Sequence, residues 1–149
     1  MENIKLVNIL LVEDNPGDVL LTQEALKDSK LINKLYVVTD GVEATDFLFK
    51  RKNYQNVPTP DMIILDLNLP KKDGWAVLTE LKADVCLKKT PVVVLTSSKA
   101  EADILKTYTL CANCYITKPI NLEKFIDVVR STEDFWLSIV TLPKQPDLT

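Results

Sequence analysis

The sequence contains no histidine, and this absence removes several classes of site at once. A catalytic triad built on histidine, a histidine-based metal centre and a histidine proton shuttle all need the imidazole ring. The chain also has no residue that could carry a phosphohistidine of its own. Enzyme and relay classes that depend on histidine within the chain are therefore excluded.

Cysteine is scarce, and its three positions are Cys86, Cys111 and Cys114. An odd and small number of cysteines does not make a disulfide framework, so we expect reduced thiols. Cys111 and Cys114 have the spacing of half a zinc site or of a redox pair. A structural zinc needs four ligands, and a thioredoxin-like pair opens a helix, whereas this pair enters a strand. Core or loop positions are the simpler interpretation, and the role of the pair stays open.

The chain also lacks a basic excess and a long apolar run. Its 18 basic and 21 acidic residues give a net charge of −3, which does not favour binding to nucleic acid. The longest apolar runs, such as Ile9 to Val12 and Val92 to Leu95, are far shorter than a membrane span. The first residues do not resemble a signal peptide. We therefore expect a cytoplasmic protein with neither a nucleic-acid nor a membrane partner.

What the sequence does contain is ordinary globular composition, with 149 residues of which 46% are hydrophobic. This length suits one domain with a sizeable core. Short apolar runs recur along the chain, and most are continuous rather than alternating, which is typical of parallel strands buried on both faces. The five predicted strands are Leu6 to Val12, Leu35 to Val38, Met62 to Leu67, Pro91 to Thr96 and Cys114 to Thr117.

Segments with helical spacing separate these runs. The clearest has a stripe of Val77, Leu78, Leu81 and Val85 behind a cap at Asp73. The other predicted helices are Pro16–Ser29, Val42–Lys50, Ala100–Leu110 and a final one that begins near Leu122 and continues toward Trp136. Alternating strands and helices predict an α/β domain, a doubly wound parallel sheet with helices on both faces. We place the domain at 1–141 and a loose tail at 142–149.

Polar residues follow the predicted strands at the same end of the sheet. Glu13 and Asp14 follow the first strand, Asp66 belongs to the third, Thr96 ends the fourth, and Lys118 follows the fifth. Ligands of open parallel sheets bind outside the carboxyl ends of the strands. The spacing therefore brings three carboxylates, a hydroxyl and an ammonium group to one site.

This set of groups indicates phosphoryl chemistry. Clustered carboxylates raise one another's pKa unless a cation neutralises them, and Mg²⁺ prefers oxygen ligands and pairs with phosphate. Asp66 could then attack phosphorus and form an aspartyl phosphate. Lys118 and the Thr96 hydroxyl would neutralise charge on the transferred group.

Nearly the whole chain resembles the receiver domain of two-component response regulators. The matching motifs are Glu13-Asp14, Leu65 to Pro70 around Asp66, Asp73-Gly74, Thr96-Ser97 and Tyr115 to Pro119. The resemblance implies a flavodoxin-like receiver fold with five strands in the order 2-1-3-4-5 and an extended C-terminal helix. It also implies that Asp66 accepts a phosphoryl group from a partner sensor histidine kinase.

The resemblance further assigns roles to individual residues. Asp14, Asp66 and the backbone carbonyl of Asn68 would ligate Mg²⁺ directly, while Glu13 would act largely through water. Thr96 and Tyr115 would form a switch pair that rearranges on phosphorylation. The Lys118-Pro119 peptide bond is similar to one that is cis in receivers.

The flanking segments are similar to the small response regulators paired with cyanobacterial phytochromes. These segments are Leu65 to Gly74, Asn113 to Tyr115, Phe135 to Leu137 and Thr141 to Pro143. Members of that group are stand-alone receivers that tend to form homodimers. Val128, Phe135 and Ile139 fall on a rotated stripe of the final helix, and we expect a dimer interface at Phe135, Trp136 and Ile139. The alternative is that the C-terminal segment folds back on its own domain. Output would pass to an unidentified downstream protein, since no further domain follows Thr149.

Other interpretations fit the same residues less well. An EF-hand loop would need a third polar ligand and a glycine at fixed positions, and this segment has neither, with Pro70 intervening. A phosphatase of the haloacid dehalogenase type would need an acid at Asn68, and an amide does not donate a titratable proton. We therefore expect a signalling protein whose catalysis is limited to gaining and losing its own phosphoryl group. The alternative is a constitutive interaction module that works without phosphorylation.

Overall fold

The computed structural model describes residues 6–27, 32–97, 114–118, 123 and 127. Strands and helices alternate along these residues. In chain order the elements are β1 (Val7–Val12), α1 (Pro16–Lys27), β2 (Asn33–Val38), α2 (Gly41–Leu48), the 3₁₀ turn η1 (Lys52–Tyr54), β3 (Met62–Asp66), α3 (Gly74–Ala83), the 3₁₀ turn η2 (Leu87–Lys89), β4 (Val92–Thr96) and β5 (Cys114–Thr117).

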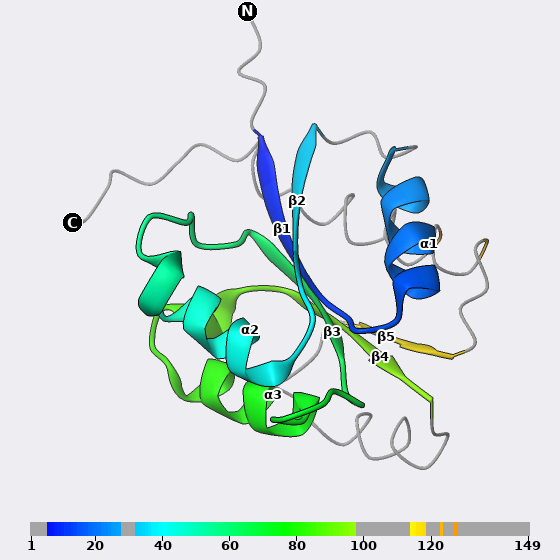
Figure 1. Cartoon of the computed structure of the whole chain (residues 1–149). Helices are drawn as coiled ribbons and strands as arrows, with labels where there is room; N and C mark the ends of the chain where they lie inside the picture. The colour runs from blue at the N-terminus through cyan, green and yellow to red at the C-terminus, as the bar shows by residue number, and fades with distance from the viewer. Residues whose placement is uncertain (1–5, 28–31, 98–113, 119–122, 124–126, 128–149) are drawn as a thin grey trace, which may run out of the picture.

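The strands form a sheet in the order β2-β1-β3-β4-β5, and every neighbouring pair is parallel. Figure 1 shows α1 on one face of this sheet and α2 with α3 on the other. The predicted parallel, doubly wound receiver arrangement is confirmed over β1 to β4. The short β5 pairs with β4 through the register Thr96↔Thr117, which puts Lys118 just beyond the sheet.

Burial explains why the central strands are continuously apolar. Every residue of β3 and β4 is buried, as is typical of central parallel strands between two layers of helices. The edge strand β2 is only partly buried, in keeping with its mixed sequence. One core cluster joins Leu10 and Val12 to Phe47 of α2 and Leu78 of α3. The other lies on the opposite face and joins its strand residues to α1 through Ala25 and Leu26.

The helix that follows Asp73 differs from its predicted extent. Asp73 caps it as expected, since its Oδ1 accepts a hydrogen bond from the Ala76 backbone N–H at 2.9 Å. Val77, Leu78 and Leu81 are buried, but Val85 is 73% exposed. The prediction for Val85 was wrong because α3 ends at Ala83, and the extended backbone of Asp84 turns Val85 away from the stripe.

Several predicted features lie outside the described residues. They are the helix Ala100–Leu110, most of the final helix, the tail at 142–149, Cys111 and Pro119, although Glu123 and Asp127 have helical backbone. Among the described residues, no helix is both long enough and apolar enough to cross a membrane.

Candidate functional site

Three parallel strands deliver the charged residues to one end of the sheet. Glu13 directly follows β1, Asp66 is the last residue of β3, and Lys118 directly follows β5. Hydrogen bonds fix these strand ends, because Glu13 N–H donates to the Val38 carbonyl at 3.0 Å and Lys118 N–H donates to the Thr96 carbonyl at 2.6 Å. The predicted placement of the three side chains together is therefore found in the structure.

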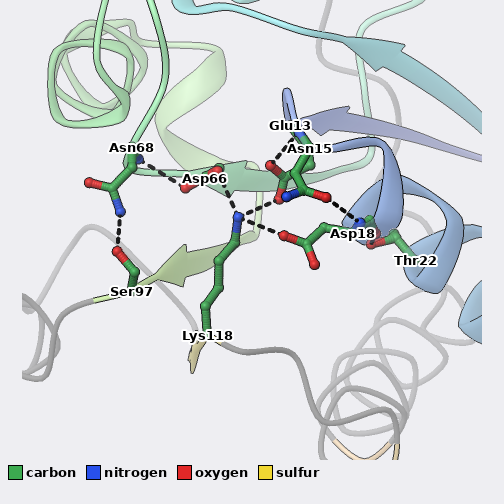
Figure 2. Close-up of polar contacts among 8 residues, drawn as sticks. All are labelled: Glu13, Asn15, Asp18, Thr22, Asp66, Asn68, Ser97 and Lys118. Atoms are coloured by element: carbon green, nitrogen blue, oxygen red, sulfur yellow. Dashed lines mark hydrogen bonds and ion pairs between the residues drawn. The ribbon is translucent and has the colours of Figure 1, made fainter.

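The Lys118 ammonium group lies at the centre of this cluster. Its Nζ is 2.9 Å from Glu13 Oε1, 2.9 Å from Asp66 Oδ2 and 2.9 Å from Asp18 Oδ2, as Figure 2 shows. Burial alone would lower the pKa of Lys118, but its contacts with these three carboxylates raise that pKa above the ordinary value. Lys118 is therefore a permanent cation that neutralises part of the acidic cluster.

Glu13 is the most buried of the acidic groups, with an exposed fraction of 0%. Its Oε2 accepts a hydrogen bond from the Asn15 backbone N–H at 3.1 Å. Its Oε1 forms no hydrogen bond of regular geometry within the described residues, so the contact with Lys118 is an ion pair. Burial raises the pKa of Glu13 to about 7, against the opposing effect of Lys118. Another cation at this site would favour the ionised form.

The carboxylates of Glu13, Asp14 and Asp66 fit a hard divalent cation. Each offers an oxygen atom, and these atoms lie within 4.8 Å of one another. Asp14 is exposed while the other two are buried, so the cluster opens to solvent on one side. An all-oxygen donor set with room for water is the kind that Mg²⁺ accepts.

The end of β4 adds hydroxyl groups beside the acidic cluster. Thr96 is buried in the last position of β4, one residue after Leu95, which pairs with Asp66. The next residue, Ser97, accepts a hydrogen bond from Asn68 Nδ2 at 2.7 Å. The Asn68 backbone N–H in turn donates to Asp66 Oδ1 at 2.9 Å. The loop after β3 is thus tied to both Asp66 and the end of β4.

Two predicted site features are not described by the structure. Tyr115 lies in β5 opposite Val94, but its side chain is outside the described part of the chain. The same holds for the whole of Phe135, Trp136 and Ile139. The switch role of Tyr115 and the dimer interface therefore stay predictions.

Sequence reasoning missed Asp18, the third carboxylate on Lys118. Asp18 lies in the first turn of α1, where an acidic residue is ordinarily explained by the helix dipole. The signal that could have found it is its place in the chain: α1 starts over the carboxyl end of β1, so its first turn faces the same site as Glu13.

Comparison with known proteins gives one consistent result. The sequence model of the response regulator receiver domain matches residues 9–130. The response regulator Rcp1 of Synechocystis sp. is 50% identical over 135 residues, which are 91% of this chain and 92% of that protein.

Solved structures agree with the sequence match. The phosphorylated cyanobacterial phytochrome response regulator RcpA is 49% identical, with a TM-score of 0.78, and the match covers 94% of this chain and 100% of that one. The Mn²⁺-bound form of Rcp1 is 48% identical, with a TM-score of 0.77, and the match covers 93% and 99% of the two chains. Together with the acidic cluster around Asp66 and Lys118, these matches show that the chain belongs to the response regulator receiver domain family.

Proposed function

We propose that Asp66 accepts a phosphoryl group from a phosphohistidine on a partner sensor histidine kinase, and that the phosphorylated chain signals through protein contacts. The observation that carries the proposal is the position of Asp66. Its Oδ2 lies 2.9 Å from the Lys118 ammonium group, and its carboxylate belongs to the three-carboxylate cluster that fits a divalent cation. This is a nucleophile surrounded by groups suited to binding phosphate.

The transfer follows from these groups. An Asp66 carboxylate oxygen forms a bond to phosphorus while the bond from phosphorus to the imidazole nitrogen breaks. The electron pair of that bond stays on the imidazole, which takes a proton from water. Lys118 and the Thr96 hydroxyl neutralise charge on the phosphoryl oxygens. Mg²⁺, held by Asp14, Asp66 and the Asn68 carbonyl, with Glu13 acting through water, would supply further charge neutralisation. Hydrolysis of the acyl phosphate restores Asp66 and releases inorganic phosphate.

The switch that reports this change would be Thr96 with Tyr115. Thr96 ends the strand that lies beside β3, and its carbonyl holds the backbone of Lys118. A shift of the Thr96 hydroxyl toward a phosphoryl group would therefore reach both β4 and β5. We propose that the Tyr115 ring fills the space that Thr96 vacates, which biases this face of the domain between two arrangements.

Intact-protein mass spectrometry after incubation with Mg²⁺ and acetyl phosphate tests the proposal. Wild type should gain one hydroxylamine-labile phosphoryl group, and Asp66→Asn should gain none. Asp61→Asn is the matched control, because Asp61 precedes β3 at the opposite end of the sheet and binds the Asn8 backbone N–H. It should be phosphorylated like wild type.

Failure to label wild type under conditions that label a known receiver would contradict the proposal. Beryllofluoride binding would then separate a short-lived acyl phosphate from a site that binds no phosphoryl group. Absence of both would favour the constitutive interaction module, whose partner binding would not depend on Asp66 or Mg²⁺.

We propose a phytochrome as the kinase partner. The support is the 49% identity to RcpA, which is described as a phosphorylated cyanobacterial phytochrome response regulator. Phosphotransfer from an autophosphorylated phytochrome kinase to wild type, compared with transfer from an unrelated histidine kinase, tests the pairing. Equal rates from both kinases would contradict it. A cytoplasmic location accords with such a partner.

We also propose that residues 1–141 form the receiver unit, with an extended C-terminal helix whose Phe135, Trp136 and Ile139 pair two copies of the chain. Sedimentation analysis of the triple alanine variant should show monomers at concentrations where wild type is dimeric. Leu20→Ala is the matched control, since Leu20 is a 57% exposed apolar side chain on α1. An unchanged dimer in the triple variant would contradict this interface.

A further inference from the structure

Asp18, in the first turn of α1, contacts the Lys118 ammonium group, and this contact is not needed to form or cap the helix. Its Oδ2 is 2.9 Å from Lys118 Nζ, and the two side chains are only 18% and 16% exposed. An ammonium group has three N–H donors. Glu13, Asp66 and Asp18 each place one oxygen at 2.9 Å from Nζ, so three carboxylates surround the ammonium group.

Local structure holds the Asp18 backbone in this place. Its N–H donates to Asn15 Oδ1 at 3.1 Å, and its carbonyl accepts from the Thr22 hydroxyl at 2.9 Å. The Asn15 N–H donates to Glu13 Oε2, so one connected turn supplies two of the three carboxylates around Lys118. Figure 2 shows Asp18 and Glu13 reaching the ammonium group from α1 and from the end of β1.

The three carboxylates around Lys118 differ in whether they also belong to the cation site. Glu13 and Asp66 also belong to the cluster that fits a divalent cation, whereas Asp18 does not. When Asp66 becomes an acyl phosphate, it also loses its carboxylate charge. Asp18 is therefore the carboxylate that keeps its full charge for Lys118 when a cation and a phosphoryl group occupy the site.

We propose that Asp18 is a positioning residue that holds the Lys118 ammonium group over Asp66 for phosphoryl transfer. The inference rests on the proposed function, since it assigns Asp18 to that same reaction. Asp18 acts through Lys118 and touches neither the phosphoryl group nor the metal. Without it, Lys118 keeps two acceptors that are both shared with the cation, and its flexible side chain is less well fixed.

The test compares wild type with Asp18→Asn, which removes the charge, and Asp18→Ala, which also removes the acceptor oxygen. Glu24→Gln is the matched control, because Glu24 lies on the same helix and pairs with Lys27 instead. The rate of phosphorylation is measured against acetyl phosphate concentration at saturating Mg²⁺. Mg²⁺ affinity is measured separately by calorimetry.

The maximal rate should fall in the order wild type, Asp18→Asn, Asp18→Ala, with a loss of about tenfold in the alanine variant, as expected for a partly buried charge-assisted hydrogen bond. Mg²⁺ affinity should change by less than about threefold, because Asp18 is not among the cation's ligands. Glu24→Gln should match wild type in both. Equal rates in all variants, or a loss of Mg²⁺ affinity as large as the loss of rate, would overturn the inference.

A spectroscopic measurement separates this inference from the proposed function. An ammonium group held by three carboxylates exchanges its protons slowly, so Lys118 should give a resolved ¹H–¹⁵N signal at low temperature. The signal should broaden or vanish in both Asp18 variants and persist in Glu24→Gln. If wild type is never phosphorylated, the proposed function fails, and this signal still decides whether Asp18 holds Lys118. An unchanged signal in folded Asp18→Ala overturns the inference.

Discussion

Tyr54 illustrates a single hydrogen bond whose contribution depends on pH. Its hydroxyl donates to Glu43 Oε1 at 2.7 Å, and this bond raises the pKa of Tyr54 from 10.0 to about 12. At a pH between these two pKa values, Tyr54 is mostly deprotonated in the unfolded chain but still protonated in the folded one. The stability that the bond contributes is therefore fully present below pH 10 and is lost as the pH rises toward 12.

We expect Tyr54→Phe to lower the free energy of unfolding by about 1 kcal/mol near pH 9, since the bond is partly exposed to solvent. The difference from wild type should vanish near pH 12. Urea unfolding at several pH values measures it. Tyr36→Phe is the control, because the Tyr36 ring also packs on Phe47 while no hydrogen bond of its hydroxyl is seen within the described residues. A pH-independent difference for Tyr54→Phe would contradict the prediction.

At the scale of single residues, sequence patterns predict the positions of side chains that lie at the ends of strands. Glu13, Asp66 and Lys118 were found because the carboxyl ends of parallel strands share one edge. Asp18 was missed because its contact depends on how the first turn of α1 is oriented over that edge. That orientation comes from hydrogen bonds of Asn15 and Thr22, which the spacing of apolar residues does not reveal.

Among the elements, α3 packs against the end of β3 with no room for a side chain. A Cβ atom at Gly74 would lie less than 3.0 Å from the Asp66 carbonyl oxygen and the Leu67 Cα. A Cβ atom at Gly41, at the start of α2, would likewise lie less than 3.0 Å from the Lys72 carbonyl group. We expect Gly74→Ala and Gly41→Ala each to lower the free energy of unfolding by about 1–3 kcal/mol, because backbone cannot move aside as a side chain can. Chemical unfolding measures both.

Gly17→Ala provides the comparison for these two variants. A Cβ atom there would meet a single side-chain atom, Asn15 Oδ1, at 3.2 Å. The change should alter the free energy of unfolding by less than about 1 kcal/mol. Gly74→Ala should also slow phosphorylation, because it displaces the backbone of Asp66. If Gly74→Ala were as stable as wild type, the close packing of α3 on β3 would not hold.

Element boundaries were less predictable than element types. The strand β2 begins at Asn33, two residues before its apolar run, because pairing with β1 continues to Val7. The stripe predicted for α3 included Val85, yet the helix ends earlier, at Ala83. Apolar spacing indicates which side of a helix is buried, whereas the end of a helix depends on capping groups that the spacing does not include.

For the molecule as a whole, the order of the strands explains why the site and the fold depend on each other. The cluster joins the ends of β1, β3 and β5, and β3 lies between β1 and β4 at the centre of the sheet. A cation held by Asp14 and Asp66, with Glu13 acting through water, would join the ends of β1 and β3, which separate when the chain unfolds. Binding to the folded state alone stabilises it by linkage.

We expect Mg²⁺ at about 100 times its dissociation constant to raise the free energy of unfolding by about 2.7 kcal/mol, and the melting temperature by about 5–10 °C. In Asp14→Asn this increase should largely disappear, because the variant loses a metal ligand. Without metal, Asp14→Asn should differ from wild type by less than about 0.5 kcal/mol, since Asp14 is exposed. Thermal unfolding followed by circular dichroism, in chelator and in Mg²⁺, measures all of these values.

Glu24→Gln removes an exposed acidic group from the neighbouring helix and should keep the full response to Mg²⁺. A wild-type response in Asp14→Asn would mean that the stabilising cation binds elsewhere. A loss of stability in Asp14→Asn without metal would mean that Asp14 has a structural partner. The prediction therefore distinguishes the contributions of two cations to stability. Lys118 belongs to the fold and neutralises the buried carboxylates with or without metal, whereas the divalent ion would stabilise the fold only when Asp14, on the solvent side, helps to bind it.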